Sequence, residues 1–168
     1  MKWSTSVPAG DLVFAASCLV LSAAAAVGYV RSSQQYGASA PVDVGDRLSA
    51  PCFDQVRAEA SILLLYRSDC RFCQESMPFY TKLAQVAGAA GVPLRVLVPE
   101  AEDDARTALG NANVAVESVT RCESFGPFRG TPVIIALDAN ARVVGTWLGR
   151  QGKAGEGQIL AAVARLAR

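Results

Sequence analysis

Three mainly apolar runs of strand length constrain the fold of this chain most strongly. They are SILLLY at residues 61–66, LRVLV at 94–98 and PVIIAL at 132–137. A strand whose two faces are both covered reads as a nearly continuous apolar run, because neither face meets water. We therefore predict that the three runs form buried strands of one sheet.

Segments with helical patterns separate and follow these strands. The patterns cover residues 73–90, 100–109 and 158–166. Two weaker elements complete the series: a minor strand at 114–119, and a strand at 143–147 that pairs back as a hairpin after a turn at 138–141. Strands that alternate with helices and end in a hairpin and a last helix predict an α/β fold, in which helices flank a mixed central sheet on both faces.

An uncharged apolar segment at residues 12–30, LVFAASCLVLSAAAAVGYV, precedes this folded part. As a helix it would extend about 28 Å, close to the thickness of the hydrocarbon core of a bilayer. We interpret it as a transmembrane helix that holds a catalytic domain outside the cytoplasm, with Cys18 as a small apolar residue of the span. The alternatives are a signal peptide cleaved near Ala24 and Ala26, which would release a secreted domain, and a buried soluble helix.

The anchor divides the chain into four parts. Residues 1–11 form a short flank, and residues 12–30 form the transmembrane or signal helix. Residues 31–50 contain Ser, Gln, Gly and Pro without a period, which is typical of a tether. Residues 51–168 then form one folded domain, which is long enough to build a hydrophobic core.

Composition excludes several kinds of chemistry. The 168 residues include no histidine, which removes Cys–His nucleophile pairs, histidine-ligated metals and histidine general bases. Sixteen basic and fifteen acidic side chains leave a net charge of +1, and no basic run offers a footprint for nucleic acid. Redox or acid–base chemistry must therefore come from Cys, carboxylates, Lys or Tyr, and we predict no nucleic-acid partner.

The motif Cys70-Arg71-Phe72-Cys73 begins the first helical segment directly after a predicted strand. Free N–H groups and the helix dipole favour a thiolate on Cys70, and Arg71 adds a positive charge beside it. Cys73 lies one turn into the helix, where its thiol can resolve a mixed disulfide formed by Cys70. We predict a thiol–disulfide oxidoreductase with Cys70 as the nucleophile and Cys73 as the resolving thiol.

The other cysteines bear on two alternatives, a metal site and two inert core cysteines. A zinc site would need two more thiolates or histidines at similar spacing, but Cys52 and Cys122 are isolated in the sequence. We predict no metal and no cofactor. Cys52 and Cys122 are candidates for a second disulfide, for a thiol near the active site, or for two unpaired apolar residues, because sequence position does not fix a Cα separation.

At this point the sequence resembles the thioredoxin superfamily. The stretch SILLLYRSDCRFCQESMPFY at residues 61–80 is similar to the family's first core strand, active-site loop and first long helix. Pro78 follows Cys73 by five residues, where thioredoxins carry a proline that kinks the helix. Gly130-Thr131-Pro132 precedes an apolar run and resembles the family's cis-proline loop.

The resemblance covers about residues 44–168 and implies a thioredoxin-like fold. It implies a cis Thr131–Pro132 bond against the CxxC loop, for which an ordinary trans proline at a strand start is the alternative. Substrate contacts are then expected from Thr131, Pro132, Arg71 and Phe72. Anchored thioredoxin-like proteins of the bacterial cell envelope, including those that serve cytochrome c maturation, are the most similar subgroup by layout. Their likeness implies protein dithiols or disulfides as substrates or redox partners.

Three positions depart from thioredoxin itself. The dipeptide between the cysteines is Arg-Phe in place of Gly-Pro, Leu64 replaces a buried acid, and Tyr66 replaces a tryptophan. The missing acid affects proton transfer while the mixed disulfide is resolved. Because no histidine stands beside Cys70, we expect a reductant or exchanger of intermediate potential, and no strong oxidant.

Two other functions compete with this prediction. A peroxiredoxin-like peroxidase is disfavoured because Arg67, and no hydroxyl residue, stands three positions before Cys70. A non-catalytic binding module on the same scaffold is the other alternative, because a fold alone does not establish activity.

Overall fold

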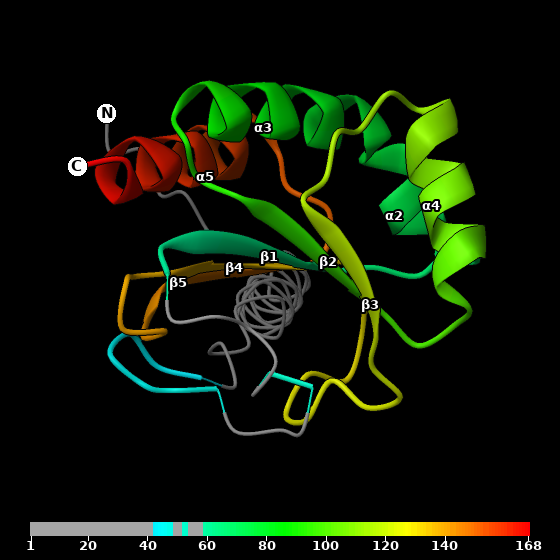
Figure 1. The fold of residues 1–168 in the computed structure, drawn as a ribbon, viewed down its shortest axis with the longest axis horizontal. Coiled ribbons are helices and arrows are strands. Elements are labelled where there is room, and N and C mark those ends of the chain that lie inside the picture. The colour runs from blue at the N-terminus through cyan, green and yellow to red at the C-terminus, as the bar shows by residue number, and fades with distance from the viewer. Residues whose placement is uncertain (1–41, 49–51, 54–58) are drawn as a thin grey trace, which may run out of the picture. The chain divides into compact units, whose positions relative to one another are not determined.

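A computed structural model describes residues 42–48, 52–53 and 59–168 of the chain. These residues contain a five-stranded sheet with the strand order β3-β2-β1-β4-β5 (Figure 1). The strands are β1 (Ser61–Leu65), β2 (Leu94–Val98), β3 (Ser118–Arg121), β4 (Val133–Leu137) and β5 (Val143–Leu148). The helices are α2 (Arg71–Glu75), α3 (Met77–Ala89), α4 (Glu102–Asn111) and α5 (Lys153–Leu166).

The sheet is mixed, with β1 at its centre. β1 pairs in parallel with β2 and antiparallel with β4, and β2 pairs in parallel with β3. β4 and β5 form the antiparallel hairpin. Every residue of β1, β2 and β4 is buried, which confirms the prediction that the three apolar runs are central strands.

All four helices of the described residues pack on one face of the sheet. The buried side chains on this face come from α2, α3, α4 and α5 and from alternate strand positions such as Ile62, Leu64 and Val96. Figure 1 shows α3 and α5 lying next to each other over the sheet, and the two helices are in contact. The parallel steps from β1 to β2 and from β2 to β3 run in the same direction, so right-handed crossovers place their helices on the same face.

Within residues 42–48, 52–53 and 59–168, no helix covers the second face, whereas the sequence predicted helices on both faces. The core on the second face contains strand residues such as Leu63 and Ile135. Within the described residues they are covered by side chains of loops, among them Cys52, Phe53 and Phe128. This arrangement leaves Cys73 and α2 on the helical face, while loop residues cover the opposite face in the described part of the chain.

The predicted helix at residues 73–90 is divided at Ser76 into α2 and α3. Pro78 has no N–H group and therefore cannot donate the helical bond to the carbonyl four residues earlier. The end of α2 is closed by Ser76, whose N–H donates to the Cys73 carbonyl at 3.2 Å and whose hydroxyl donates to the Phe72 carbonyl at 2.7 Å. The short helix α2 thus holds the CxxC motif separately from the long helix α3.

Three other boundaries differ from the sequence predictions. α4 begins at Glu102, because Glu100 and Ala101 belong to the loop before it. The third strand occupies 118–121 in place of 114–119, because the Val114 N–H still bonds the Leu109 carbonyl at the end of α4. α5 begins five residues early at Lys153, in a stretch where Gly155 and Gly157 weaken the helical pattern.

The predicted anchor at residues 12–30 lies outside the described residues, as do the flank at 1–11 and most of the tether at 31–50. None of the helices in the described part of the chain combines the length and the apolar character needed to span a bilayer.

Candidate active site

Cys70 caps the N-terminus of α2. The loop after β1 returns the chain at this point, with the Cys70 N–H donating to the Arg67 carbonyl at 3.3 Å. The Cys70 Sγ accepts a hydrogen bond from the Cys73 N–H at 3.2 Å. Cys70 is half-buried and Cys73 is fully buried, and both are free thiols. This placement agrees with the prediction that Cys70 is the accessible thiol at a helix start.

The loop that ends in Pro132 contacts Cys70 directly. The Thr131–Pro132 peptide bond is cis, as predicted from Gly-Thr-Pro. The Cys70 Sγ donates a hydrogen bond to the Thr131 carbonyl oxygen at 3.3 Å, and the Pro132 carbonyl accepts from the Gly149 N–H at 2.7 Å. The start of β4 therefore borders the nucleophilic sulfur, with Thr131 half-buried and Pro132 buried.

Hydrogen bonds favour the ionised form of Cys70. Burial raises the pKa of the Cys70 thiol, but hydrogen bonds from the side chains of Cys73 and Thr131 and from the N–H groups of Cys73 and Phe72 outweigh it, so this pKa is lowered. The sequence predicted that Arg71 adds a positive charge beside this thiolate, but the lowered pKa of Cys70 comes from the hydrogen bonds. The Arg71 side chain is 86% exposed and donates to the Glu75 carboxylate at 2.8 Å, so its charge is compensated away from the sulfur.

Cys73 has the opposite environment. Burial, followed by its hydrogen bond with the Cys70 side chain, raises the pKa of Cys73 to about 12. Burial also raises the pKa of Tyr66 to about 12, with the negative charge of a Cys73 thiolate as the next cause. Leu64, which stands where thioredoxin carries an acid, is fully buried. Cys70 is therefore the thiol of the pair that loses its proton first, and Cys73 is the thiol that stays protonated.

The different pKa values predict different alkylation profiles. In the reduced chain, iodoacetamide should modify Cys70 first, with a midpoint below the ordinary thiol pKa of about 8.5, while Cys73 reacts slowly at every pH below that value. Trypsin cuts after Arg67, Arg71 and Lys82, so the two cysteines fall on different peptides and can be quantified separately by mass spectrometry. Faster modification of Cys73 than of Cys70 would contradict the assignment of the two thiols.

Ion pairs hold the loops around Cys70. Arg67 and Asp69 form two hydrogen bonds, at 3.0 and 2.8 Å, in the loop before the motif. Glu75 at the end of α2 accepts from Arg71 and also from Arg150, at 2.9 Å, in the loop after β5. The carboxylate of Glu75 therefore links the CxxC helix to the β5–α5 connection.

Phe72 is presented outward beside these ion pairs. Its side chain is 55% exposed, which is unusual for a large apolar residue in the described chain. Arg71 and Phe72 are both accessible at the surface next to Cys70. Their predicted contact with a substrate stays a prediction, as do the substrate contacts of Thr131 and Pro132.

Cys52 and Cys122 form a disulfide, with their Cα atoms 5.5 Å apart. Both residues are buried in the core on the face opposite to Cys73. The bond resolves the alternatives that the sequence left open, since neither sulfur is a free thiol near the active site. It ties the described residues 52–53 to the end of β3.

Sequence analysis did not assign a site role to Glu100. The helix pattern placed it in α4, but it follows the end of β2, where its carboxylate accepts from the Ser68 N–H at 2.6 Å. Ser68 lies in the loop between β1 and Cys70, so Glu100 fixes the backbone just before the nucleophile. Its position two residues after β2 becomes a signal only once β2 is known to lie parallel to β1, because the ends of such strands meet at one edge of a sheet.

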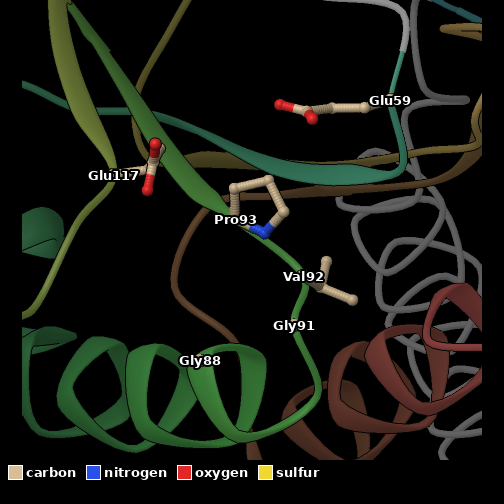
Figure 2. A pocket seen from close by; sticks show the side chains of 6 residues that line it. All are labelled: Glu59, Gly88, Gly91, Val92, Pro93 and Glu117. Atoms are coloured by element: carbon tan, nitrogen blue, oxygen red, sulfur yellow. The ribbon is translucent and has the colours of Figure 1, made fainter.

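A separate hollow lies at the opposite end of the sheet from Cys70. Its lining comes from the end of α3 and from the residues that precede β1, β2 and β3. Figure 2 shows these residues in close-up: Glu59, Gly88, Gly91, Val92, Pro93 and Glu117. Glu59 forms an ion pair with the Arg95 side chain of β2. No cysteine lines this hollow, and no group of three or more potential metal-ligating side chains occurs anywhere in the described residues.

The architecture and the site together define a thioredoxin-like fold that carries a CxxC pair at the start of a helix and a cis-proline loop beside it. Three solved structures show the likeness. One is the thioredoxin domain of a thiol-disulfide oxidoreductase from Bacteroides vulgatus, with a TM-score of 0.59 and 14% identity over 76% of this chain and 99% of that one. Another is a protein assigned as the thiol:disulfide interchange protein DsbE of Chlorobium tepidum, with a TM-score of 0.54 and 20% identity over 73% and 99% of the two chains.

The third is a secreted disulfide oxidoreductase from Mycobacterium tuberculosis, described as homologous to the Escherichia coli DsbE, with a TM-score of 0.51 and 16% identity over 68% and 87% of the two chains. At these identities the likeness establishes the fold. No protein-family model matches the sequence, and no curated protein matches it.

Proposed function

We propose that this chain is a thiol–disulfide oxidoreductase that exchanges electrons with protein disulfides through Cys70 and Cys73. The observation that carries the proposal is the asymmetric pair: Cys70 is accessible with a lowered pKa, and Cys73 is buried beside it with a raised pKa. The similar structures named above are thiol-disulfide oxidoreductases or interchange proteins, which agrees with this chemistry.

The exchange follows from the positions of the two sulfurs. The Cys70 thiolate attacks one sulfur of a substrate disulfide, forming a mixed disulfide and releasing the other substrate sulfur as a thiolate that takes up a proton. Cys73 then loses its proton and attacks the Cys70 sulfur, which frees the second substrate thiol. The substrate disulfide gains two electrons and two protons, and the two cysteines lose them as they join.

The site favours thiol–disulfide exchange over the two alternatives, a binding module and a peroxidase. A binding module does not need a thiol with a lowered pKa, whereas thiol exchange does, because the thiolate is the nucleophile. The peroxidase alternative gains no support, because the Arg67 guanidinium three positions before Cys70 is engaged with Asp69.

We further propose that the domain works outside the cytoplasm and that residues 12–30 hold it at a membrane. The Cys52–Cys122 disulfide supports a location outside the cytoplasm, because disulfides persist in oxidising environments and are rare in the cytosol. The uncharged length of 12–30 supports the anchor. A secreted domain, released by cleavage, is the alternative form of the same proposal.

The proposal predicts a reversible Cys70–Cys73 couple of intermediate potential. A lowered Cys70 pKa stabilises the reduced form, which raises the potential relative to that of a dithiol with ordinary pKa values. We expect a value above that of thioredoxin, about −270 mV. No histidine is present and Arg71 is exposed and paired, so the value should stay below the strong oxidants at about −120 mV. Titration of the full chain against a glutathione buffer, with the two tryptic peptides quantified, measures it.

Two results of that titration would count against the proposal. A pair that never joins at any buffer composition would remove the redox function. A potential near that of the strong oxidants would keep the enzyme but reverse the expected flow of electrons, so that it would insert disulfides into its substrates.

A further inference from the structure

A groove borders Cys70 on the side of the loop between β3 and β4. Its volume is about 310 Å³, at the lower end of the range of about 300 to 1,000 Å³ typical of ligand sites. Its lining includes Arg67, Glu123, Ser124, Phe128, Arg129 and Thr131. We call it the β3–β4 groove. Its volume suits a few residues of an extended peptide and is far too small for a folded domain.

The groove adjoins the nucleophilic sulfur through two of its lining residues. The Thr131 carbonyl accepts the hydrogen bond from the Cys70 Sγ at 3.3 Å. The Arg67 carbonyl accepts from the Cys70 N–H at 3.3 Å. A polypeptide whose cysteine reaches Cys70 can therefore continue into the groove without leaving the surface.

The loop between β3 and β4 forms the wall of the groove, and contacts hold its backbone at both ends and in the middle. Cys122 precedes it and is bonded to Cys52, and Thr131 ends it at the start of β4. In between, Phe128 is buried in the core, and its N–H donates to the Phe125 carbonyl at 3.2 Å. The Ser124 hydroxyl accepts from the Gly126 N–H at 3.3 Å. The disulfide, the buried Phe128 side chain and these two hydrogen bonds therefore hold the backbone of the loop.

Arg129 gives this surface its charge. The groove contains three charged lining residues, and two of them are compensated: Arg67 by Asp69 at 2.8 Å and Glu123 by Arg121 at 3.4 Å. Arg129 is exposed and forms no ion pair within the described residues. One positive charge therefore remains available beside the path to Cys70.

We propose that the β3–β4 groove binds the substrate segment that flanks the reactive cysteine, and that Arg129 selects substrates with an acidic residue in that segment. The inference rests on the proposed function and names its substrate class, a polypeptide that carries a carboxylate near its disulfide. A guanidinium is a suitable partner because it presents several N–H donors to a carboxylate in a fixed geometry.

The test uses the full chain with Cys73→Ser, so that the reaction stops at the mixed disulfide. Three peptides differ only in the residues two positions on either side of a single cysteine, which are Glu, Gln or Lys. Each cysteine is joined to thionitrobenzoate, so attack by Cys70 on the peptide sulfur breaks that bond and releases the coloured thiolate. The leaving group is the same in all three, so rate differences report contacts with the peptide.

The Glu peptide should react about two- to fivefold faster than the Lys peptide, which is the range expected for an exposed charge pair. The preference should shrink as salt is added, because the charges are exposed to solvent. Arg129→Gln should remove the preference, and Arg129→Glu should reverse it. Arg165→Glu, an exposed residue near the C-terminus of α5, makes the same charge change away from the groove and should leave the order intact.

A neutral disulfide, 2-hydroxyethyl disulfide, serves as the control for Cys70 itself and should react equally with all variants. The inference is overturned if Arg129→Glu keeps the wild-type order, or if Arg165→Glu shifts it by as much. Equal rates for the three peptides would refute the inference and leave the proposed function standing. No reaction with any disulfide would overturn both.

Discussion

Replacing Cys70 by serine should reduce the rate of protein-disulfide reduction to the uncatalysed background. A serine hydroxyl cannot form a mixed disulfide, and Cys73 is buried too deeply to take over the attack, with none of its side chain exposed. The assay is the reduction of insulin by dithiothreitol in the presence of the full chain. The loss should be complete, because no other free thiol is accessible among the described residues.

Cys73→Ser provides the matched comparison. This variant keeps the nucleophile, so its first step should run at close to the normal rate. Turnover should fall sharply, because only the added dithiothreitol is left to resolve the mixed disulfide. Persistent turnover in Cys70→Ser would show that the reaction does not use this pair. Equal loss of the first step in both variants would show that the two thiols do not have the separate roles proposed for them.

Removing the Cys52–Cys122 disulfide should lower the stability of the domain substantially. In Cys52→Ala with Cys122→Ala, the free energy of unfolding should fall by about 2 to 5 kcal/mol, the range found when native disulfides are removed. The two cysteines are 70 residues apart in sequence, and both are buried. The loss therefore combines a freer unfolded chain with a disturbed core on the face that contains Phe53 and Phe128.

Urea unfolding of the full chain, followed by circular dichroism, measures this loss. Cys52→Ala alone should cost about as much as the double variant, because it already breaks the bond. Cys73→Ala, compared with wild type while Cys70 and Cys73 are both reduced, is the matched control. In that state it removes a buried sulfur without opening a disulfide, so its smaller cost separates packing from the crosslink. An unfolding free energy in the double variant within about 0.5 kcal/mol of wild type, the usual range for surface substitutions, would contradict the structural role.

The central part of the fold could be predicted from the sequence because its strands are buried on both faces. Residues 61–66 and 132–137 are mainly apolar, as expected for strands that are covered on both faces. The third strand was placed four residues early because it is only partly buried, so its pattern is weak. The start of α5 was missed because glycines lower local helix propensity, while packing against α3 stabilises the helix.

The site was predictable in its sulfur chemistry and less so in its electrostatics. The spacing of Cys70 and Cys73 and the Gly-Thr-Pro sequence were sufficient to place the pair and the proline loop. Arg71 was assigned to the Cys70 thiolate, although Glu75 at i+4 was visible in the sequence and forms the ion pair. The contact of Glu100 with Ser68 depends on strand order, which residue spacing does not give.

The pairing of Cys52 with Cys122 could not be decided from the sequence for a similar reason. The two residues come close only because the end of β3 is brought to the loop before β1 by the packing of the second face. The charge of the β3–β4 groove likewise depends on which arginines are paired within the fold. Ion pairs with carboxylates are formed by Arg67, Arg71 and Arg150, whereas Arg129 forms none within the described residues.

The most direct test of the central claim is to identify which sulfur carries a trapped substrate. Cys73→Ser in the full chain would be allowed to react in intact cells, purified without reductant, and digested with trypsin. Cleavage after Arg67 and Arg71 isolates Cys70 on the peptide Ser-Asp-Cys-Arg. We predict that partner peptides are attached to this tetrapeptide by a disulfide, and that the double variant Cys70→Ser, Cys73→Ser captures none. Partners attached instead to Cys18, Cys52 or Cys122, or captured equally by the double variant, would contradict the assignment of Cys70 as the nucleophile.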